Sequence, residues 1–119
     1  MINYFILEDT PDDILNLKEV YINSVANPSR FVCLFASGDD AEISDAIESL
    51  KANNTKVDLV FIDYELTGIY GTDYIDKIDR YFDKPVKILI SSEIKLEDEI
   101  EIVTPLRQNK DKIYYIRKG

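Results

Sequence analysis

The chain has 119 residues, a hydrophobic content of 45% and a formal net charge of −9. This length suffices for one compact domain, so we expect a single domain over residues 1–119. The negative charge opposes the approach of phosphate groups and argues against nucleic acid or an anionic membrane surface as a partner. Histidine is absent, which excludes histidine-based catalysis and histidine-ligated zinc.

A cytoplasmic location is expected from two further features. Cys33 is the only cysteine, so no disulfide can form within the chain. The sequence has no signal-peptide pattern and no apolar stretch long enough to span a bilayer. We predict that Cys33 is a small buried hydrophobe in the apolar segment 31–35.

Short apolar runs alternate along the chain with segments of helical periodicity, the pattern of βα units around a parallel sheet. In chain order we expect a strand over 2–7, a helix over 11–26, a strand over 30–36, a helix over 40–53, a strand over 57–62, a helix over 72–82, a strand over 86–91, a helix over 96–107 and a strand over 112–117. The first three helices present apolar faces, formed by Ile14, Leu17, Tyr21 and Val25, by Ile43, Ala46, Ile47 and Leu50, and by Ile75, Ile78 and Phe82.

Acidic residues stand where the first and third strands end. Glu8 and Asp9 follow the apolar run 4–7, and Asp63 follows the apolar run 59–62. Open parallel sheets place their ligand sites beyond the carboxyl ends of such strands, so the three carboxylates converge if these strands are neighbours. Carboxylates packed together repel one another unless a cation compensates them, and oxygen ligands suit Mg²⁺ better than Zn²⁺. The hypothesis is a Mg²⁺ pocket centred on Asp63.

Helix capping is the alternative task for these acidic residues. In the segment 8–13 we assign the N-cap to Thr10, with Asp13 three residues later in a box-like arrangement. This leaves Glu8 and Asp9 without an evident structural task, which favours a functional one. For Asp39, capping of the following helix is a sufficient explanation.

These residues, in this order, resemble the receiver domains of bacterial two-component response regulators over nearly the whole chain. The resemblance implies a flavodoxin-like α/β fold, a doubly wound five-stranded parallel sheet of order 2-1-3-4-5, here lacking the fifth helix. That order places the first strand beside the third. Gly71 follows Asp63 by eight positions, as a glycine commonly does in the family, whereas Thr67 and Gly119 stand where most members have proline.

The resemblance also implies a chemistry. Asp63 is expected to be the phosphoacceptor, receiving a phosphoryl group from a phosphohistidine on a sensor histidine kinase or a histidine phosphotransfer protein. The cofactor is Mg²⁺, held by Glu8, Asp9, Asp63 and the backbone carbonyl of Glu65. Such a receiver is not a conventional enzyme, because it catalyses only its own phosphorylation and dephosphorylation.

The later residues of the family pattern have counterparts here as well. Ser91 and Lys118 are expected to bind the phosphoryl oxygens. Ser91 and Tyr115 are expected to form the conformational switch, which changes the surface around the fourth helix and the fifth strand.

Three other functions remain as alternatives. The first is a receiver-like interaction module that is not phosphorylated. The second is a Mg²⁺-dependent aspartyl-phosphate phosphohydrolase, because segment 63–67 loosely resembles the Asp-x-Asp-x-Thr signature of haloacid-dehalogenase-type enzymes, but with Glu65 in the place of the second aspartate. The third, a flavin carrier, is disfavoured by the four carboxylates in 8–13, where a phosphate would have to bind.

The final predicted strand is apolar or aromatic on both faces, and no helix follows Gly119 to cover it. Exposed apolar surface of this kind marks interfaces. We therefore expect either a homodimer through the region of the fourth helix and the last strand, or a covering helix in a longer parent protein.

Overall fold

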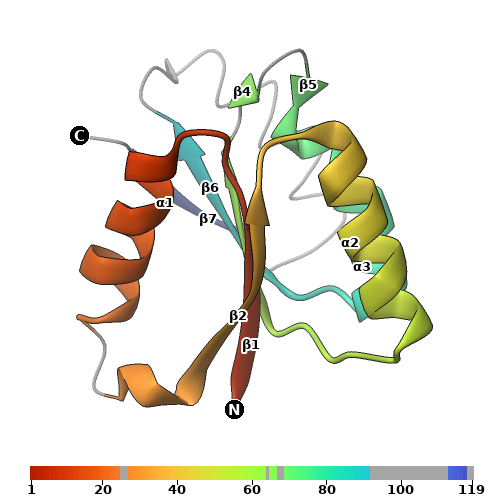
Figure 1. Ribbon diagram of the computed structural model, residues 1–119, viewed down its shortest axis with the longest axis horizontal. Helices are drawn as coiled ribbons and strands as arrows, with labels where there is room; N and C mark the ends of the chain where they lie inside the picture. The colour runs from red at the N-terminus through yellow and green to blue at the C-terminus, as the bar shows by residue number, and fades with distance from the viewer. Residues whose placement is uncertain (25–26, 64, 67–68, 92–112, 118–119) are drawn as a thin grey trace.

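The computed structural model describes residues 1–24, 27–63, 65–66, 69–91 and 113–117 (Figure 1). The elements in chain order are β1 (Ile2–Leu7), α1 (Pro11–Asn16), η1 (Leu17–Ile22), η2 (Pro28–Arg30), β2 (Phe31–Ser37), α2 (Asp40–Ala52), β3 (Leu59–Asp63), β4 (Glu65–Leu66), β5 (Ile69–Tyr70), η3 (Gly71–Tyr74), α3 (Ile75–Phe82), β6 (Val86–Ser91) and β7 (Ile113–Arg117). The predicted alternation of strands and helices is therefore confirmed as far as residue 91. The helix predicted over 96–107 lies outside the described residues.

The main sheet has the strand order β2-β1-β3-β6-β7, and every neighbouring pair in it is parallel. The predicted α/β class with a parallel sheet is confirmed, and β1 lies beside β3. Helix α1 covers one face of the sheet, while α2 and α3 cover the other (Figure 1). None of the described helices combines the length and apolar character needed to cross a membrane.

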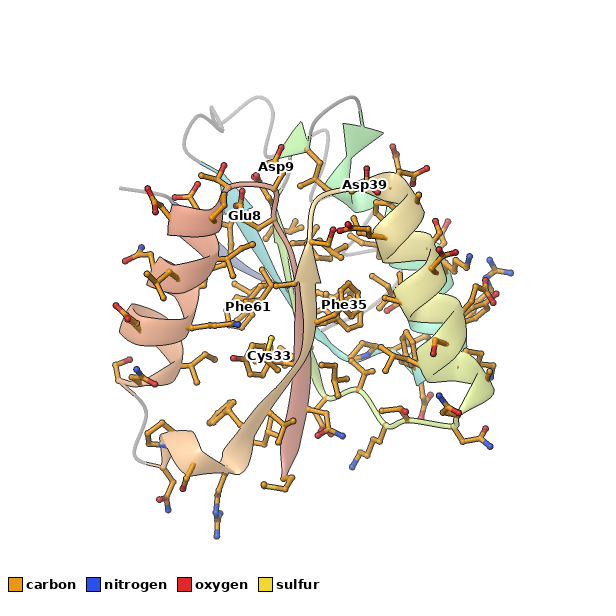
Figure 2. The ribbon with its side chains drawn as sticks, in the orientation of Figure 1. Glu8, Asp9, Cys33, Phe35, Asp39 and Phe61 are labelled. Carbon is orange, nitrogen blue, oxygen red and sulfur yellow. The ribbon has the colours of Figure 1, made fainter. Side chains whose placement is uncertain are left out.

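Two apolar clusters, one on each face, hold the sheet in register. Tyr4 and Phe61 pack edge to face on the α1 side, with ring centroids 5.9 Å apart. Phe5 stacks on Phe35 on the α2 and α3 side, with centroids 4.6 Å apart. Figure 2 shows Phe61 and Phe35 on opposite sides of the sheet. Because alternate residues of β1 enter different clusters, a one-residue slip would exchange the two sets of side chains.

The first helix is shorter than predicted and changes its winding. The α-helical part ends at Asn16 and continues as a π-helix from Leu17 to Ile22, so the prediction of a helix reaching residue 26 is wrong. A π-helix bonds residue i to i+5, as the N–H of Asn23 does to the carbonyl of Lys18 at 3.2 Å. This wider turn brings both Leu17 and Ile22 into the core, a spacing that a 3.6-residue period does not anticipate.

Cys33 is half-buried rather than buried as predicted. It lies on β2, the strand at one edge of the sheet, and packs against the cluster on the α1 side. An edge strand has a neighbour on one side only, so its side chains are less completely covered. The third helix also differs slightly from expectation, because η3 forms a 3₁₀ turn before α3 begins at Ile75.

A buried lysine joins β6 to α3. Lys87 is 1% exposed, and its ammonium forms an ion pair with the carboxylate of Asp79. It also donates to the carbonyl of Pro85 at 3.1 Å. The face of β6 that carries Lys87 is therefore the face that α3 covers, although a lysine on a strand ordinarily indicates a solvent-facing side.

Removal of Asp79 should destabilise the protein more than removal of Lys87. Asp79→Ala leaves a buried ammonium with too few partners, and breaking a buried ion pair in this way costs about 3 to 5 kcal/mol. Lys87→Met removes the buried charge and leaves Asp79, which is 13% exposed, within reach of water. Urea unfolding of each variant measures the difference, with Lys84→Met as an exposed-lysine control. Equal losses for the two partners would contradict this assignment.

Candidate functional site at the carboxyl edge of the sheet

Glu8 organises the turn that follows β1. Its N–H donates to the carbonyl of Ser37 at 3.0 Å, so the chain stays attached to β2 for one residue beyond the strand. The side chain is 1% exposed, and its Oε1 accepts from the N–H groups of Asp9 and Thr10, each at 3.1 Å. The inference that Glu8 has no structural task is therefore wrong, because its carboxylate satisfies two backbone donors in the loop.

Thr10 occupies the N-cap position of α1, as predicted, but its side chain makes no capping hydrogen bond. The Thr10 hydroxyl donates instead to Oδ1 of Asp9, at 3.4 Å. The loop before α1 is thus organised by carboxylates that accept from neighbouring backbone and side-chain donors. The same carboxylates, those of Glu8 and Asp9, belong to the candidate site.

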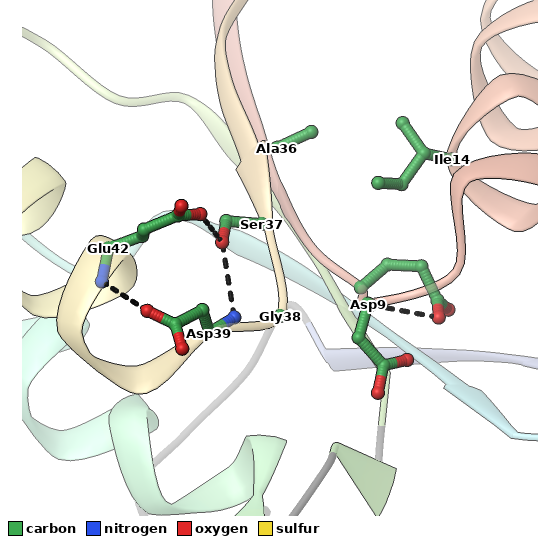
Figure 3. A pocket seen from close by; sticks show the side chains of 8 residues that line it. Asp9, Ile14, Ala36, Ser37, Gly38, Asp39 and Glu42 are labelled. Atoms are coloured by element: carbon green, nitrogen blue, oxygen red, sulfur yellow. Dashed lines mark hydrogen bonds between the residues drawn. The ribbon is translucent and has the colours of Figure 1, made fainter.

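The turn between β2 and α2 faces this loop. Asp39 accepts the N–H of Glu42 at 3.0 Å, which confirms its predicted capping role. The Ser37 hydroxyl accepts from the N–H of Asp39 at 3.1 Å and donates to the carboxylate of Glu42 at 2.6 Å (Figure 3). A pocket of about 390 Å³ lies between the two loops, lined by Glu8, Asp9, Ile14, Ala36, Ser37, Gly38, Asp39 and Glu42.

Asp63 ends β3 and is 7% exposed. Strand β3 is flanked by β1 and β6, with Ile62 beside Leu7 and Asp63 beside Ile90. Asp63 therefore lies level with Glu8, the residue that follows Leu7. Carboxyl ends of parallel strands meet at one edge, and here that edge carries an acid from each of two neighbouring strands.

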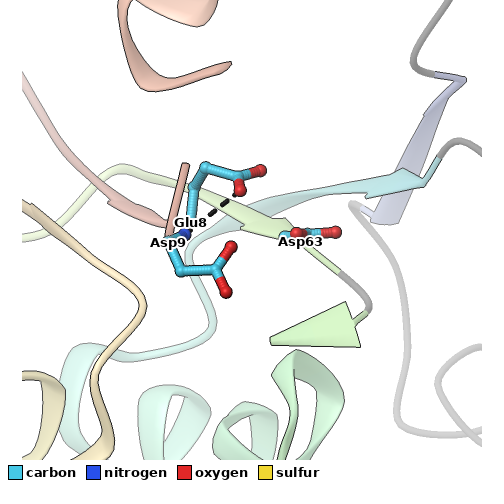
Figure 4. A group of neighbouring side chains, drawn as sticks. All are labelled: Glu8, Asp9 and Asp63. Atoms are coloured by element: carbon cyan, nitrogen blue, oxygen red, sulfur yellow. Dashed lines mark hydrogen bonds between the residues drawn. The ribbon is translucent and has the colours of Figure 1, made fainter. Parts of the chain in front are cut away.

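The three predicted carboxylates do come together. One oxygen from each of Glu8, Asp9 and Asp63 lies within 4.8 Å of the other two (Figure 4). Two unit charges at about 4 Å repel one another by roughly 1 kcal/mol in water and about 4 kcal/mol at an effective dielectric constant near 20. A divalent cation would turn this repulsion into attraction. The donors are all oxygens, which fits a hard cation such as Mg²⁺ or Ca²⁺.

A short hairpin begins two residues after Asp63, at positions where no strand is predicted from the sequence. Strand β4 pairs antiparallel with β5, with Glu65 beside Tyr70 and Leu66 beside Ile69. Leu66 is buried in the cluster on the α2 and α3 side, so the hairpin is anchored to the core. Its sequence signal is the pair Thr67-Gly68 between the apolar residues Leu66 and Ile69, and strands of two residues are too short to show a period.

Tyr74 connects the segment after this hairpin to the start of α2. Its hydroxyl donates to the carboxylate of Asp40. Burial, and then the hydrogen bond to Asp40, raise the pKa of Tyr74 above its usual value. This contact joins two segments that lie 34 positions apart in the sequence, so no local pattern indicates it.

The structure describes the backbones of Glu65, Ser91 and Tyr115. Ser91 is the last residue of β6 and lies beside Arg117 of β7. Tyr115 lies beside Leu89, in the middle of the same pair of strands. Lys118 falls outside the described residues.

The sequence matches no family model and no curated protein. Solved structures do match. A response regulator protein from Burkholderia pseudomallei, whose crystal structure has a phosphorylated aspartic acid, a calcium ion and citrate, is 12% identical with a TM-score of 0.67. The match covers 100% of this chain and 61% of that one, so this chain spans less than two thirds of that neighbour.

Two further neighbours have the same architecture. A response regulator receiver domain protein from Methanospirillum hungatei is 21% identical with a TM-score of 0.66, over 100% of this chain and 82% of that one. A chain from the complex of histidine kinase ThkA with response regulator protein TrrA is 18% identical with a TM-score of 0.63, over 100% and 87%. This chain therefore has the fold of response regulator receiver domains.

Proposed function

We propose that this protein is a phosphorelay receiver. In this proposal Asp63 accepts a phosphoryl group from a phosphohistidine on a sensor histidine kinase or a histidine phosphotransfer protein, in a Mg²⁺-dependent reaction. The main support is the meeting of three carboxylates within 4.8 Å at the carboxyl edge of a receiver-type sheet. The neighbour with a phosphorylated aspartic acid and the neighbour in complex with a histidine kinase add support.

Asp63 is the nucleophile in the proposed reaction. Its carboxylate oxygen forms a bond to phosphorus, the bond from phosphorus to the donor's imidazole nitrogen breaks, and that nitrogen keeps the electron pair. A bound divalent cation would neutralise charge on the transferring oxygens. Water later attacks the acyl phosphate, releases inorganic phosphate and restores the Asp63 carboxylate. The protein thus catalyses its own phosphorylation and dephosphorylation.

The proposed cation ligands differ in how directly they contact the cation. Asp9, the exposed member of the three, binds most directly, together with Asp63. Glu8 binds through water or orients the site, which agrees with its hydrogen bonds to the loop backbone. The backbone carbonyl of Glu65 supplies the remaining protein ligand. Mg²⁺ prefers octahedral oxygen coordination and keeps several waters, so this set is sufficient.

Phosphorylation adds about 1.5 to 2 negative charges and new acceptor oxygens. We propose that Ser91 and Lys118 bind these oxygens, and that Ser91 and Tyr115 act as the switch. The altered surface comprises residues 96–107 and 112–117.

In this proposal, residues 1–119 form one receiver domain in the cytoplasm with a doubly wound five-stranded sheet. A second copy of the chain is a further proposed partner, through residues 96–107 and 112–117. Nucleic acid and membranes are not proposed as partners, because the net charge of −9 opposes binding to both.

Incubation with a small phosphodonor and Mg²⁺ should add one phosphoryl group to wild type and none to Asp63→Asn. The amide of asparagine is a poor nucleophile, so it cannot form the acyl phosphate. Intact-mass spectrometry measures the addition, and alkaline or hydroxylamine treatment should remove it.

Asp73→Asn is the matched control, because Asp73 is an exposed aspartate on the segment that follows the hairpin. It should be labelled like wild type. Labelling of Asp63→Asn at the wild-type level would show that the nucleophile is another residue. No label on wild type would favour the interaction-module alternative.

Millimolar Mg²⁺ should raise the melting temperature of wild type by mass action. Asp9→Ala should lose most of this increment. In EDTA the same variant should melt at or above the wild-type temperature, because it removes one of three mutually repelling charges. Thermal unfolding with Mg²⁺ and with EDTA measures both effects.

Asp12→Ala makes the same change in charge at an exposed position of the first turn of α1 and should keep the wild-type increment. Glu8→Ala should lose less of the increment than Asp9→Ala, yet be less stable in EDTA, because two backbone donors lose their acceptor. A full Mg²⁺ increment in Asp9→Ala would rule out this cation site.

A further inference from the structure

Gly38 lies where the end of β2 meets the loop after β1. Strands β1 and β2 are paired as far as Leu7 and Ser37, and the N–H of Glu8 extends the pairing to the Ser37 carbonyl. Gly38 is the next residue and is buried. Figure 3 shows it directly beside Asp9, at the side of the pocket between the two loops.

The space for a side chain at Gly38 is already filled by Asp9. A Cβ added there would lie 2.3 Å from Cβ of Asp9, 2.5 Å from its Cα and 2.5 Å from its nitrogen. Real Cβ atoms essentially never approach a heavy atom within 3.0 Å. Two of these three atoms belong to the main chain, so a rotamer change of Asp9 cannot relieve the overlap. The loop itself would have to move.

Backbone torsion does not explain the glycine. The φ of Gly38 lies outside the left-handed range that disfavours other residues. Glycine is required here for close approach of two backbone segments, which is the second common reason for its use. The steric constraint is specific to Asp9, because all three nearest atoms belong to that residue.

Movement of Asp9 would disturb the acidic cluster. The N–H of Asp9 is held by Oε1 of Glu8, and the N–H of Glu8 is held by the carbonyl of Ser37, so Asp9 is tied to β2 through Glu8. With the loop in this place, one oxygen from each of Glu8, Asp9 and Asp63 lies within 4.8 Å of the other two. Raising the closest separation from 2.3 Å to 3.0 Å takes a shift of about 0.7 Å, which is large beside the roughly 0.2 Å that metal-ligand distances tolerate.

We propose that Gly38 is a positioning residue for the cation site. Because Gly38 has no side chain, the main chain of Asp9 can pack against β2. This packing places the Asp9 carboxylate near those of Glu8 and Asp63. The inference rests on the proposed function, because it assumes that the three carboxylates bind a divalent cation. It adds a residue that supplies no ligand atom and yet sets the affinity of the site.

The test compares Gly38→Ala with Ser37→Ala in the full chain. Ser37→Ala removes the hydroxyl that bonds Asp39 and Glu42, so it loosens the same turn without adding an atom beside Asp9. Mg²⁺ affinity is measured by calorimetry, and Tb³⁺ affinity by luminescence sensitised by tyrosine. Substitution of residues that orient the metal ligands typically weakens metal binding by roughly 10- to 100-fold. We expect such a loss in Gly38→Ala and a change of less than about twofold in Ser37→Ala.

Each outcome identifies which idea fails. Wild type that binds neither cation overturns the proposed metal site and this inference with it. Wild-type binding with equal affinity in Gly38→Ala overturns the inference alone. Equal weakening in Gly38→Ala and Ser37→Ala would mean that general loosening of the turn is responsible, which also overturns it.

A stability cycle in EDTA tests the steric part without any metal, and it remains decisive if Gly38→Ala folds poorly. Asp9→Gly removes the atom that lies closest to the added Cβ and makes the loop backbone more adaptable. The loss of stability caused by Gly38→Ala should therefore be smaller in the Asp9→Gly background than in wild type. Equal losses in both backgrounds, or failure of both variants to fold, would overturn the inference.

Discussion

The parallel pairing of β1 with β3 is the constraint on which the rest of the site depends. It sets Leu7 beside Ile62, so the acidic residues that follow leave the sheet at the same level. The pairing is enforced from both faces, because β1 contributes Phe5 and Leu7 to one apolar cluster and Tyr4 and Ile6 to the other. The positions of the carboxylates are therefore fixed by the hydrophobic core rather than by any attraction among them.

At this edge of the sheet, the arrangement that suits cation binding lowers the stability of the fold. The core brings like charges together, and local hydrogen bonds then hold them there. Glu8 is the clearest example, since the same carboxylate that belongs to the acidic cluster also accepts two backbone N–H bonds. A carboxylate offers about four acceptor positions, so this structural task is compatible with contact to a cation. The loop and the cluster are thus a single unit, and a change in one must alter the other.

Prediction from sequence succeeded where a local pattern carries the information. Four-residue apolar runs located β1 and β3, and the residue after each run located Glu8 and Asp63. Periodicity also identified the buried faces of α2 and α3, including Ile43, Ile47 and Ile78. These features depend on burial within one element, which repeats regularly along the chain.

Prediction failed where contacts between distant segments, or irregular winding, decide the structure. The π-helical turn changes the spacing of the buried residues between Leu17 and Ile22, and no particular residue type indicates such a turn. The burial of Lys87 depends on an acid supplied by another element, Asp79 of α3.

Gly38 shows most clearly why a local reading is incomplete. Within its own segment it is one small residue before a capped helix, and nothing nearby in sequence requires glycine. The requirement arises 29 positions away, from the main chain of Asp9. Because Asp9 belongs to the acidic cluster, a residue that bears no functional group determines whether functional groups on another strand can meet. Residues that only make room are therefore as much a part of this site as its carboxylates, and they become visible only once the strands are placed side by side.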